Sequence, residues 1–297
     1  MTTSFDITQF TVDNGWCPGC GNFSILNVIK KTLSDLSIDP HNMVIASGIG
    51  QAAKMPQYIN TSYFNGLHGR ALPVATAIKA SNPRLLVFAE GGDGDMYGEG
   101  GNHFMHAVRR NIDIVHLVHD NMVYGLTKGQ ASPTSQRGFV TPLQYNGVTN
   151  EPANPLAVAL SYGATFIARA YSGDREQFQT ILTEAIKHKG YALIDVFHPC
   201  VTFNKVNTHS WFKEKIYYVD EKYDRTVFEN AVQKVFEKEK FPLGIIYQQT
   251  GLKTFNDTLP DTVPTIKSPP YSVRPSKWAS CLRQQGNTPM RAIILCT

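Results

Sequence analysis

The amino-acid sequence predicts an α/β fold built on a doubly wound parallel sheet. Short apolar runs alternate with longer amphipathic segments, which is the pattern of strands joined by crossover helices. The turn Gly-Gly-Asp-Gly-Asp follows one apolar run directly, as in strand–turn–helix units that bind phosphate. A hydrophobic content of 42% in 297 residues is enough for a substantial core.

The spacing of apolar residues predicts the helices and strands, and residues that interrupt helices predict where they end. Apolar side chains recur every three to four residues between Asn22 and Leu36, which predicts an amphipathic helix. A second helix over 69–80 ends where Ser81-Asn82-Pro83 interrupts the pattern. Ser172 is expected to cap the helix at 174–188. The other helices are expected at 97–110, 156–161 and 225–239, and the strands at 43–47, 85–89, 114–118, 165–168 and 192–196.

Three stretches depart from this alternation. Residues 128–154 are rich in Ser, Thr, Pro, Gly and Gln, and a loop this long is usually functional or disordered. The polar stretch from 200 to 240 is interpreted as a surface excursion with one helix. We expect a single domain over residues 1–250, and a tail over 251–297 that packs on a partner or is loosely ordered.

Composition narrows the functional classes. A net charge of +4, from 28 basic and 24 acidic residues, is too mild to indicate a nucleic-acid-binding protein. No apolar run is long enough for a membrane span, and the first ten residues lack the pattern of a secretory signal. The five cysteines, an odd number, indicate metal-binding or free thiols in a reducing cytoplasm.

Two polar residues follow neighbouring strands of the expected sheet. Asp93 comes after the strand at 85–89, and Asn121 after the strand at 114–118. The carboxyl ends of such strands lie side by side, and carboxylate and amide oxygens suit Mg²⁺. The surrounding glycines allow close approach of a phosphate. The sequence therefore predicts a metal-bridged diphosphate, although a turn residue and a helix cap are the alternative interpretation.

The spacing of these residues is part of a longer set of motifs. Gly92-Asp93-Gly94 is separated from Asn121 by residues 95 to 120. The blocks WCPGCG at 16–21, SGIG at 47–50, GLHGR at 66–70 and YGLTKGQ at 124–130 occur in the same chain. Together they resemble the beta subunits of 2-oxoacid:ferredoxin oxidoreductases, over about residues 10 to 250.

The resemblance implies a thiamine-diphosphate-binding fold and the oxidative decarboxylation of a 2-oxoacid, with coenzyme A taking the acyl group and ferredoxin the electrons. It also implies a separate alpha subunit, because no segment here resembles the domain that activates the aminopyrimidine. We expect a heterodimer, or a two-fold dimer of heterodimers. The alternatives are a pyruvate or branched-chain 2-oxoacid enzyme, a non-oxidative thiamine-dependent decarboxylase subunit, and a non-catalytic partner subunit.

The resemblance also implies roles for individual residues. Asp93, Asn121 and the backbone carbonyl of Val123 would bind Mg²⁺. Asp95 either orients the metal ligands or caps the next helix, and His68 either handles protons or phosphate or is structural. The residues expected to contact the cofactor are Gly48, Ile49, Gly50, His68, Gly92, Gly94, Asp95, Gly125, Leu126 and Thr127.

Two lysines are implied in the recognition of the substrate. The resemblance places Lys54 and Lys128 beside the carboxylates of the 2-oxoacid, although exposure to solvent is the usual state of a lysine. Two cations suit a dicarboxylate, so 2-oxoglutarate is the favoured substrate.

The cysteines depart from the family pattern. A Cys17–Cys20 pair alone fits a zinc half-site, a redox dithiol or an iron–sulfur half-site. The resemblance makes Cys17, Cys20 and Cys200 ligands of a [4Fe-4S] cluster, but Gln51 stands where the remaining cysteine is expected. Either three thiolates and an unusual ligand hold the cluster, or a tail cysteine substitutes, or the cluster is labile or absent. The tail cysteines are Cys281 and Cys296.

Overall fold

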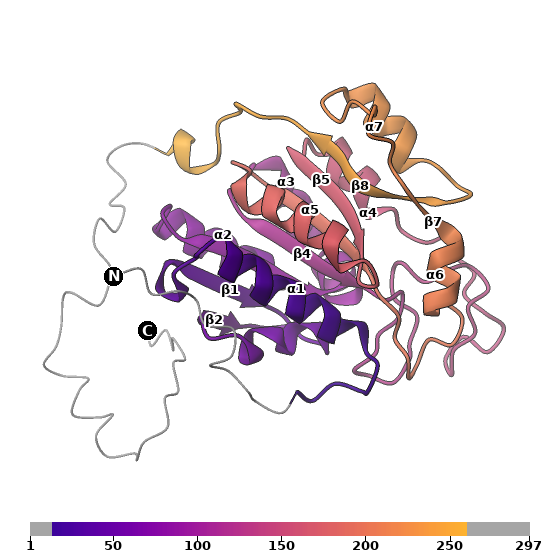
Figure 1. The fold of residues 1–297 in the computed structure, drawn as a ribbon. Helices are drawn as coiled ribbons and strands as arrows, with labels where there is room; N and C mark the ends of the chain where they lie inside the picture. Colours follow the sequence, from indigo (N-terminus) through magenta and orange to yellow (C-terminus); the bar gives the residue numbers. More distant parts are fainter. Residues whose placement is uncertain (1–13, 260–297) are drawn as a thin grey trace, which may run out of the picture.

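The computed structural model describes residues 14–259, in which eight strands form one sheet with helices on both faces (Figure 1). The spatial order is β2-β1-β3-β4-β6-β5-β8-β7. The strands are β1 (Met43–Ser47), β2 (Ser62–Asn65), β3 (Leu86–Gly92), β4 (Val115–Asp120), β5 (Phe166–Tyr171), β6 (Ala192–Phe197), β7 (Ile216–Tyr218) and β8 (Phe241–Gln248).

Long helices and short helical turns connect these strands. The helices are α1 (Gly21–Asp35), α2 (Ala71–Ser81), α3 (Gly101–Arg109), α4 (Pro155–Ser161), α5 (Arg175–Lys187), α6 (His209–Lys215) and α7 (Phe228–Val235). The shorter turns are η2 (Pro40–Asn42), η3 (Ala52–Tyr58), the π-helical η4 (Gly94–Glu99) and η5 (Asn256–Thr258).

The prediction of a doubly wound parallel sheet is confirmed, with one addition at its edge. The strands from β2 through β5 all pair in parallel, whereas β8 pairs with β5 in the antiparallel direction. Every residue of β1, β4, β5 and β6 is buried. Burial on both faces explains why these strands appear in the sequence as continuous runs without alternation.

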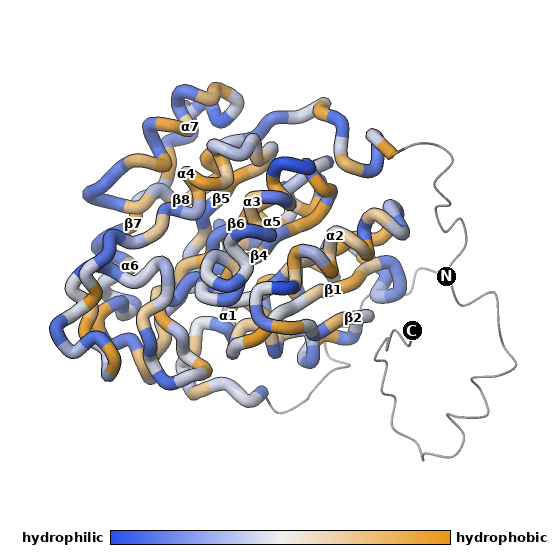
Figure 2. The backbone as a smooth tube through the Cα atoms, turned by 180° about the vertical axis from the view of Figure 1, so that it is seen from behind, coloured by the Kyte–Doolittle hydropathy of each residue, from blue (hydrophilic) through white to orange (hydrophobic). Residues whose placement is uncertain are grey.

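The two faces of the sheet are covered by different helices. Side chains of α1 and α5 form one apolar cluster with the sheet, and those of α2, α3, α4 and α7 form the other. Ile25, Ile29 and Leu33 of α1 are fully buried, and each such side chain contributes about 1.5–3 kcal/mol. In Figure 2 the most hydrophobic parts of the tube follow the central strands and parts of the helices that pack on the sheet.

Several expected boundaries and elements need correction. The helix predicted at 174–188 begins at Arg175 and is capped by Asp174, whose side chain accepts from the Gln177 N–H at 3.1 Å, and not by Ser172. The helix predicted at 225–239 is confined to α7. The stretch from 200 to 240 also contains α6 and β7, so the prediction of one helix there was wrong, and β8 was not predicted.

The long loop was predicted correctly, because residues 128–154 contain no helix and no extended strand. Backbone hydrogen bonds nevertheless hold this loop in one conformation. The Gly138 N–H donates to the Val148 carbonyl at 2.8 Å, and the Ala153 N–H to the Pro133 carbonyl at 2.8 Å. These bonds fix a segment whose sequence shows no periodicity.

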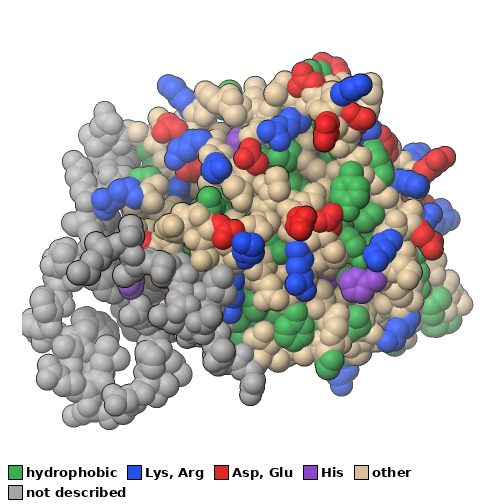
Figure 3. All heavy atoms as spheres, viewed as in Figure 1, with side chains coloured by type: hydrophobic (Ala, Val, Ile, Leu, Met, Phe, Trp, Pro, Cys, Tyr) green, Lys and Arg blue, Asp and Glu red, His purple; other side chains and the backbone are tan. Residues whose placement is uncertain are grey.

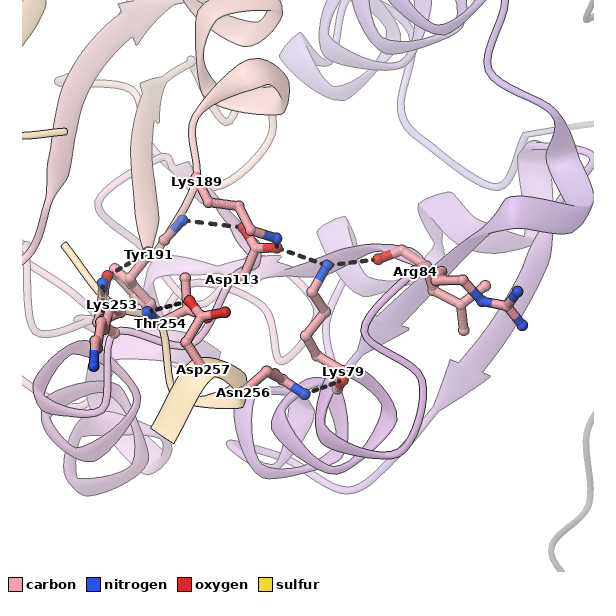
Figure 4. Close-up of polar contacts among 12 residues, drawn as sticks. Lys79, Arg84, Asp113, Lys189, Tyr191, Lys253, Thr254, Asn256 and Asp257 are labelled. Carbon is pink, nitrogen blue, oxygen red and sulfur yellow. Dashed lines mark hydrogen bonds and ion pairs between the residues drawn. The ribbon is translucent and has the colours of Figure 1, made fainter. Parts of the chain in front are cut away.

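The described part of the predicted tail, residues 251–259, packs on the domain. The Phe255 N–H donates to the Asn111 carbonyl at 3.2 Å, and the Asn256 side chain to the Lys79 carbonyl at 3.2 Å (Figure 4). The rest of the tail, with Cys281 and Cys296, lies outside the described residues.

A cluster of charged side chains lies at the amino ends of the strands, at the opposite end of the sheet from the predicted site. Asp113, just before β4, lies 2.8 Å from Nζ of Lys79 and 2.6 Å from Nζ of Lys189 (Figure 4). Burial raises the pKa of Asp113, but the hydrogen bonds from Lys189 and Lys79 outweigh it and hold the pKa below its usual value. The cluster therefore links α2, the start of β4 and the turn after α5.

Charges of both signs are interspersed on the face shown in Figure 3, among smaller apolar areas. Between residues 14 and 259, none of the helices has the length and apolar character that crossing a bilayer requires.

Candidate functional site

The carboxyl ends of β3 and β4 bring the predicted magnesium ligands together. Gly92 lies opposite His119 in the parallel register, so Asp93 and Asn121 follow directly after the two strands. Both residues line a cavity of about 100 Å³ at this edge of the sheet. The juxtaposition is the one that the sequence predicts.

Beneath this cavity, one hydroxyl lies between two buried carboxylates. Oγ1 of Thr134 is 2.6 Å from Oδ2 of Asp93 and 2.8 Å from Oδ1 of Asp120. A hydroxyl has one hydrogen, so it donates to one of the two at a time. Burial raises the pKa of Asp93 to about 6 and that of Asp120 well above its usual value.

The donor set at Asp93 fits a divalent cation. None of the ion pairs among residues 14–259 involves Asp93, although its side chain is buried. A buried carboxylate without a cationic partner is costly, and a hard cation with oxygen ligands would remove that cost. Asn121 at the adjacent strand end supplies a second oxygen of the required kind.

The turn after β4 has a strained backbone that side-chain hydrogen bonds stabilise. Met122 has φ of 58°, a left-handed conformation that bulky residues rarely adopt. Its N–H donates to Oδ1 of Asp120 at 3.1 Å, and its carbonyl accepts from the Ser135 hydroxyl at 2.6 Å. Oδ1 of Asn121 accepts from the Val123 N–H at 3.2 Å. These bonds fix the positions of Asn121 and of the Val123 backbone.

Two of the predicted cofactor glycines have room for a side chain, Gly50 in open space and Gly92 in ordinary van der Waals contact. A Cβ at Gly50 would meet nothing within 4 Å, and a Cβ at Gly92 would have its nearest neighbour at 3.9 Å. Gly50 also has φ of 131°, which favours glycine whatever the space. Both glycines line the cavity, so a phosphate could approach the backbone at these positions.

Two more of the predicted glycines, Gly48 and Gly94, have a different explanation. A Cβ at Gly48 would lie 2.1 Å from Oδ2 of Asp95, and a Cβ at Gly94 would lie 2.1 Å from the Tyr124 ring. Packing within the protein therefore accounts for the missing side chain at both positions. Gly94 lines the cavity, but Gly48 does not.

Asp95 connects two loops at the cavity wall. Its Oδ1 accepts the N–H of Gly69 at 2.7 Å and that of Ile49 at 3.2 Å, and burial raises the pKa of its carboxyl. Nδ1 of His68 lies 3.2 Å from the same oxygen and 3.2 Å from Oε2 of Glu99. Asp95 therefore links the loops that carry Ile49 and Gly69, while a role in orienting the metal ligands stays a prediction.

The predicted cluster cysteines lie together on another wall of the cavity. Cys17, Cys20 and Cys200 line it with Gln51. Burial raises the pKa of the Cys20 thiol to about 11, and the nearby sulfurs of Cys200 and Cys17 add to the effect. The indole of Trp16 donates to the Gln51 carbonyl at 2.7 Å, which fixes the backbone there.

These residues fit an iron–sulfur cluster at three positions and not at the fourth. Thiolates are the usual ligands of such clusters, whereas the Gln51 amide is a hard, neutral donor. Its Oε1 is buried and has no hydrogen-bond partner among residues 14–259. In the same part of the chain, no group of three or more His, Cys, Asp or Glu, the three cysteines included, is arranged so that it could hold a metal ion.

A buried polar pair behind the wall was not predicted. Nδ1 of His119 lies 2.8 Å from Oδ1 of Asn22, and its Nε2 lies 3.2 Å from Oε1 of Glu90. Glu90 is fully buried, and burial raises the pKa of its carboxyl well above the usual value. Asn22 lines the cavity, so its side chain connects the His119–Glu90 pair to the site.

The structure brings most of the sequence-predicted residues into this cavity. Lys54 and Lys128 are not among the lining residues, and Lys128 is exposed. Tyr124 was part of a quoted motif but received no role. The lining residues that sequence reasoning missed are Trp16, Asn22, Ala52, Tyr124, Val201, Thr202 and Phe203.

Comparison with known protein families gives two matches. Residues 41–196 match the C-terminal TPP binding domain of thiamine pyrophosphate enzymes. Residues 200–263 match the C-terminal part of the pyruvate ferredoxin oxidoreductase beta subunit. The first match contains β3, β4 and the loop between β4 and α4, and the second begins at Cys200.

Individual relatives agree with these matches. A 2-oxoacid:ferredoxin oxidoreductase subunit beta from a Sulfolobus species is 44% identical, over 83% of this chain and 85% of that protein. A 2-oxoglutarate oxidoreductase subunit from Mycobacterium tuberculosis is 43% identical over 66% of this chain and 53% of its own length. The 2-oxoglutarate:ferredoxin oxidoreductase from Magnetococcus marinus, solved with 2-oxoglutarate, coenzyme A and succinyl-CoA, has a TM-score of 0.83 at 34% identity, covering 86% of this chain and 88% of that one.

Proposed function

Because this chain belongs to the family of 2-oxoacid:ferredoxin oxidoreductase beta subunits, we propose that it binds the diphosphate of thiamine diphosphate through Mg²⁺ and serves a 2-oxoglutarate-converting complex. The observation that carries the proposal is the buried carboxylate of Asp93, which no cation among residues 14–259 neutralises and which stands beside Asn121 at the next strand end.

The residues would divide the binding of the cofactor among them. Asp93, Asn121 and the Val123 carbonyl would hold the cation. Gly50 and Gly92 would admit the phosphates, since a Cβ at Gly50 would meet nothing within 4 Å and one at Gly92 nothing nearer than 3.9 Å. The bound cofactor supplies the electron sink for decarboxylation. The protein contributes a rigid edge of the sheet and the charge of one carboxylate.

The identity of the 2-oxoacid rests on two kinds of support. Relatives from Mycobacterium tuberculosis and Methanocaldococcus jannaschii are named for 2-oxoglutarate. Lys54 lies in η3, next to the cavity residues Gln51 and Ala52, and Lys128 lies in the turn that follows Thr127. We propose that these two lysines bind the carboxylates of a dicarboxylate at the mouth of the cavity. We propose further that the electrons pass to ferredoxin and the acyl group to coenzyme A.

We propose in addition that Cys17, Cys20 and Cys200 hold an iron–sulfur cluster with Gln51 opposite its fourth iron. Support comes from their shared cavity wall and from the buried, unpartnered oxygen of Gln51. The pyruvate-type, non-oxidative and non-catalytic alternatives remain, and the assembled complex distinguishes them by its products.

Substitution of Asp93 tests the magnesium site. Asp93→Asn keeps the shape of the side chain and removes its charge, so the affinity of the assembled complex for thiamine diphosphate at fixed Mg²⁺ should fall by more than about 100-fold, beyond the effect usual for an outer-shell partner. Isothermal titration calorimetry on the complex of alpha and beta subunits measures this.

Asp113→Asn is the matched control. It makes the same chemical change at the opposite end of the sheet, so it should leave cofactor affinity unchanged. Cofactor binding by Asp93→Asn that equals the unsubstituted complex would refute the assignment.

A further inference from the structure

A short segment of the long loop forms a closed turn beneath the cavity. The Ser132 N–H donates to the Ser135 hydroxyl at 2.9 Å, and the Ser135 N–H donates to the Ser132 carbonyl at 3.1 Å. Ser132, Thr134 and Ser135 are all buried. Pro133 between them is held by its carbonyl, which accepts the Ala153 N–H at 2.8 Å. The turn is therefore a rigid unit anchored on the far side of the loop.

This turn contacts both strand ends that carry the proposed metal ligands. The Thr134 hydroxyl lies within hydrogen-bond distance of Asp93, after β3, and of Asp120, at the end of β4. The Ser135 hydroxyl donates to the carbonyl of Met122, in the strained turn that follows Asn121. A single anchored turn thus links the two sides of the site.

We propose that Thr134 is a positioning residue that sets the spacing between Asp93 and Asn121 for Mg²⁺. Its hydroxyl holds Oδ2 of Asp93 near the end of β4, and this contact limits the positions that the carboxylate can take beside Asn121. The inference rests on the proposed magnesium site and adds the group that shapes it.

Without the hydroxyl, Asp93 and Asp120 would lose the donor that contacts both of their carboxyl groups. Asp93 would then no longer be held toward the end of β4, and its carboxylate could turn away from Asn121, because outer hydrogen bonds are what orient such ligands. The cation would then find its ligands misplaced, whereas the diphosphate contacts at the open glycines would be unchanged.

The test is the Mg²⁺ dependence of cofactor binding by the assembled complex. Thr134→Val has nearly the same shape without the hydroxyl, and the Mg²⁺ concentration that gives half-maximal thiamine diphosphate binding should rise about 10–100-fold. At saturating Mg²⁺ the affinity for the cofactor should return to that of the unsubstituted complex. Thr134→Ser retains the hydroxyl and should stay within about threefold of it, well under the loss from an outer-shell deletion.

Two further variants separate positioning from general stability. Thr165→Val removes a buried threonine hydroxyl far from the site, where it bonds to Asn111 at 2.9 Å, and it should lower thermal stability without moving the Mg²⁺ dependence. Thr134→Ala, which adds no branched apolar group, should repeat the shift if Thr134→Val does not assemble.

The outcomes are distinct. An unchanged Mg²⁺ dependence in a folded Thr134→Val or Thr134→Ala complex overturns the inference while leaving the proposed function intact. An unsubstituted complex that binds thiamine diphosphate without any requirement for a divalent cation overturns the proposed function itself. A shift in both Thr134 variants that Thr134→Ser and Thr165→Val do not share supports the inference.

Discussion

At position 51 the resemblance implies a cysteine ligand for the cluster, whereas this chain has Gln51. Its backbone is held by the Trp16 indole, and its side-chain oxygen is buried without a partner beside three cysteines. A cluster held by three thiolates has one iron without a strong anionic ligand. We therefore expect the purified complex to contain substoichiometric iron or to lose it in air.

Gln51→Cys should improve iron retention. The Trp16 hydrogen bond is made to the backbone, so it survives the substitution and presents the new thiolate from the same position. Anaerobic iron and sulfide analysis with electron paramagnetic resonance, before and after exposure to air, compares the two complexes. Gln51→Ala removes the amide without adding a thiol and should not improve retention. A full, air-stable four-iron cluster in the unsubstituted complex would contradict this prediction.

Residues at the site differ in how far the sequence could predict them. Asp93 and Asn121 were found because strand ends can be inferred from apolar runs, and parallel pairing then brings them together. Thr134 was not found, because it lies in an aperiodic loop and its importance comes from two contacts across 41 and 14 residues of chain. No local pattern records such contacts.

At the scale of elements, the charged cluster around Asp113 connects α2 to the start of β4. It occupies the amino ends of the strands, far from the cavity (Figure 4). Removing one partner of a well-buried pair costs about 3–5 kcal/mol, and partial exposure of Asp113 reduces that figure. The cluster stabilises the fold and takes no part in the site.

Asp113→Asn should therefore lower the free energy of unfolding at pH 7 by on the order of 2 kcal/mol. The pKa of Asp113 is depressed in the folded state, so its contribution is complete above the ordinary carboxylate pKa and is lost as pH falls through the lower folded value. The difference between the two proteins should accordingly shrink near pH 3, which is about the lower end of carboxylate titration.

Urea unfolding at both pH values measures this. Asp35→Asn, which breaks an exposed pair with Lys31, is the matched control and should change stability little. Equal destabilisation by Asp113→Asn at neutral and acid pH would show that the ionised pair is not responsible.

The elements that the sequence predicted well are those with strong local signals. β1 was predicted at its observed bounds, and α1 within one residue at each end. β7 and β8 were missed because their pairing partners are supplied by distant parts of the chain. β8 is antiparallel to β5, which lies some seventy residues earlier, and it lacks the continuous burial of the central strands.

At the scale of the whole molecule, we propose that this chain supplies one part of an active site. Its cavity of about 100 Å³ is smaller than the roughly 300–1,000 Å³ of complete ligand pockets. Membership of a beta-subunit family implies an alpha subunit, and the cavity is open for a second chain to complete.

We expect the isolated chain to be inactive and the complex with its alpha subunit to turn over 2-oxoglutarate in preference to pyruvate. Reduction of an electron acceptor in the presence of coenzyme A, with each 2-oxoacid in turn, measures both. Turnover by the isolated chain would contradict the shared site, and a preference for pyruvate would contradict the assignment of the substrate while leaving the shared site in place.

The strand order has a consequence for the time course of synthesis. β6 lies between β4 and β5, and within residues 14–259 β5 pairs with β6 and β8, both of which are later in the chain. While the ribosome adds residues 121–191, the edge of β4 therefore has no partner. Unpaired edges invite association with other nascent chains, and pairing over such separations is slow. The free edge of β4, in the half of the sheet that carries Asp93 and Asn121, is therefore covered only after β6 has been synthesised and has paired with it.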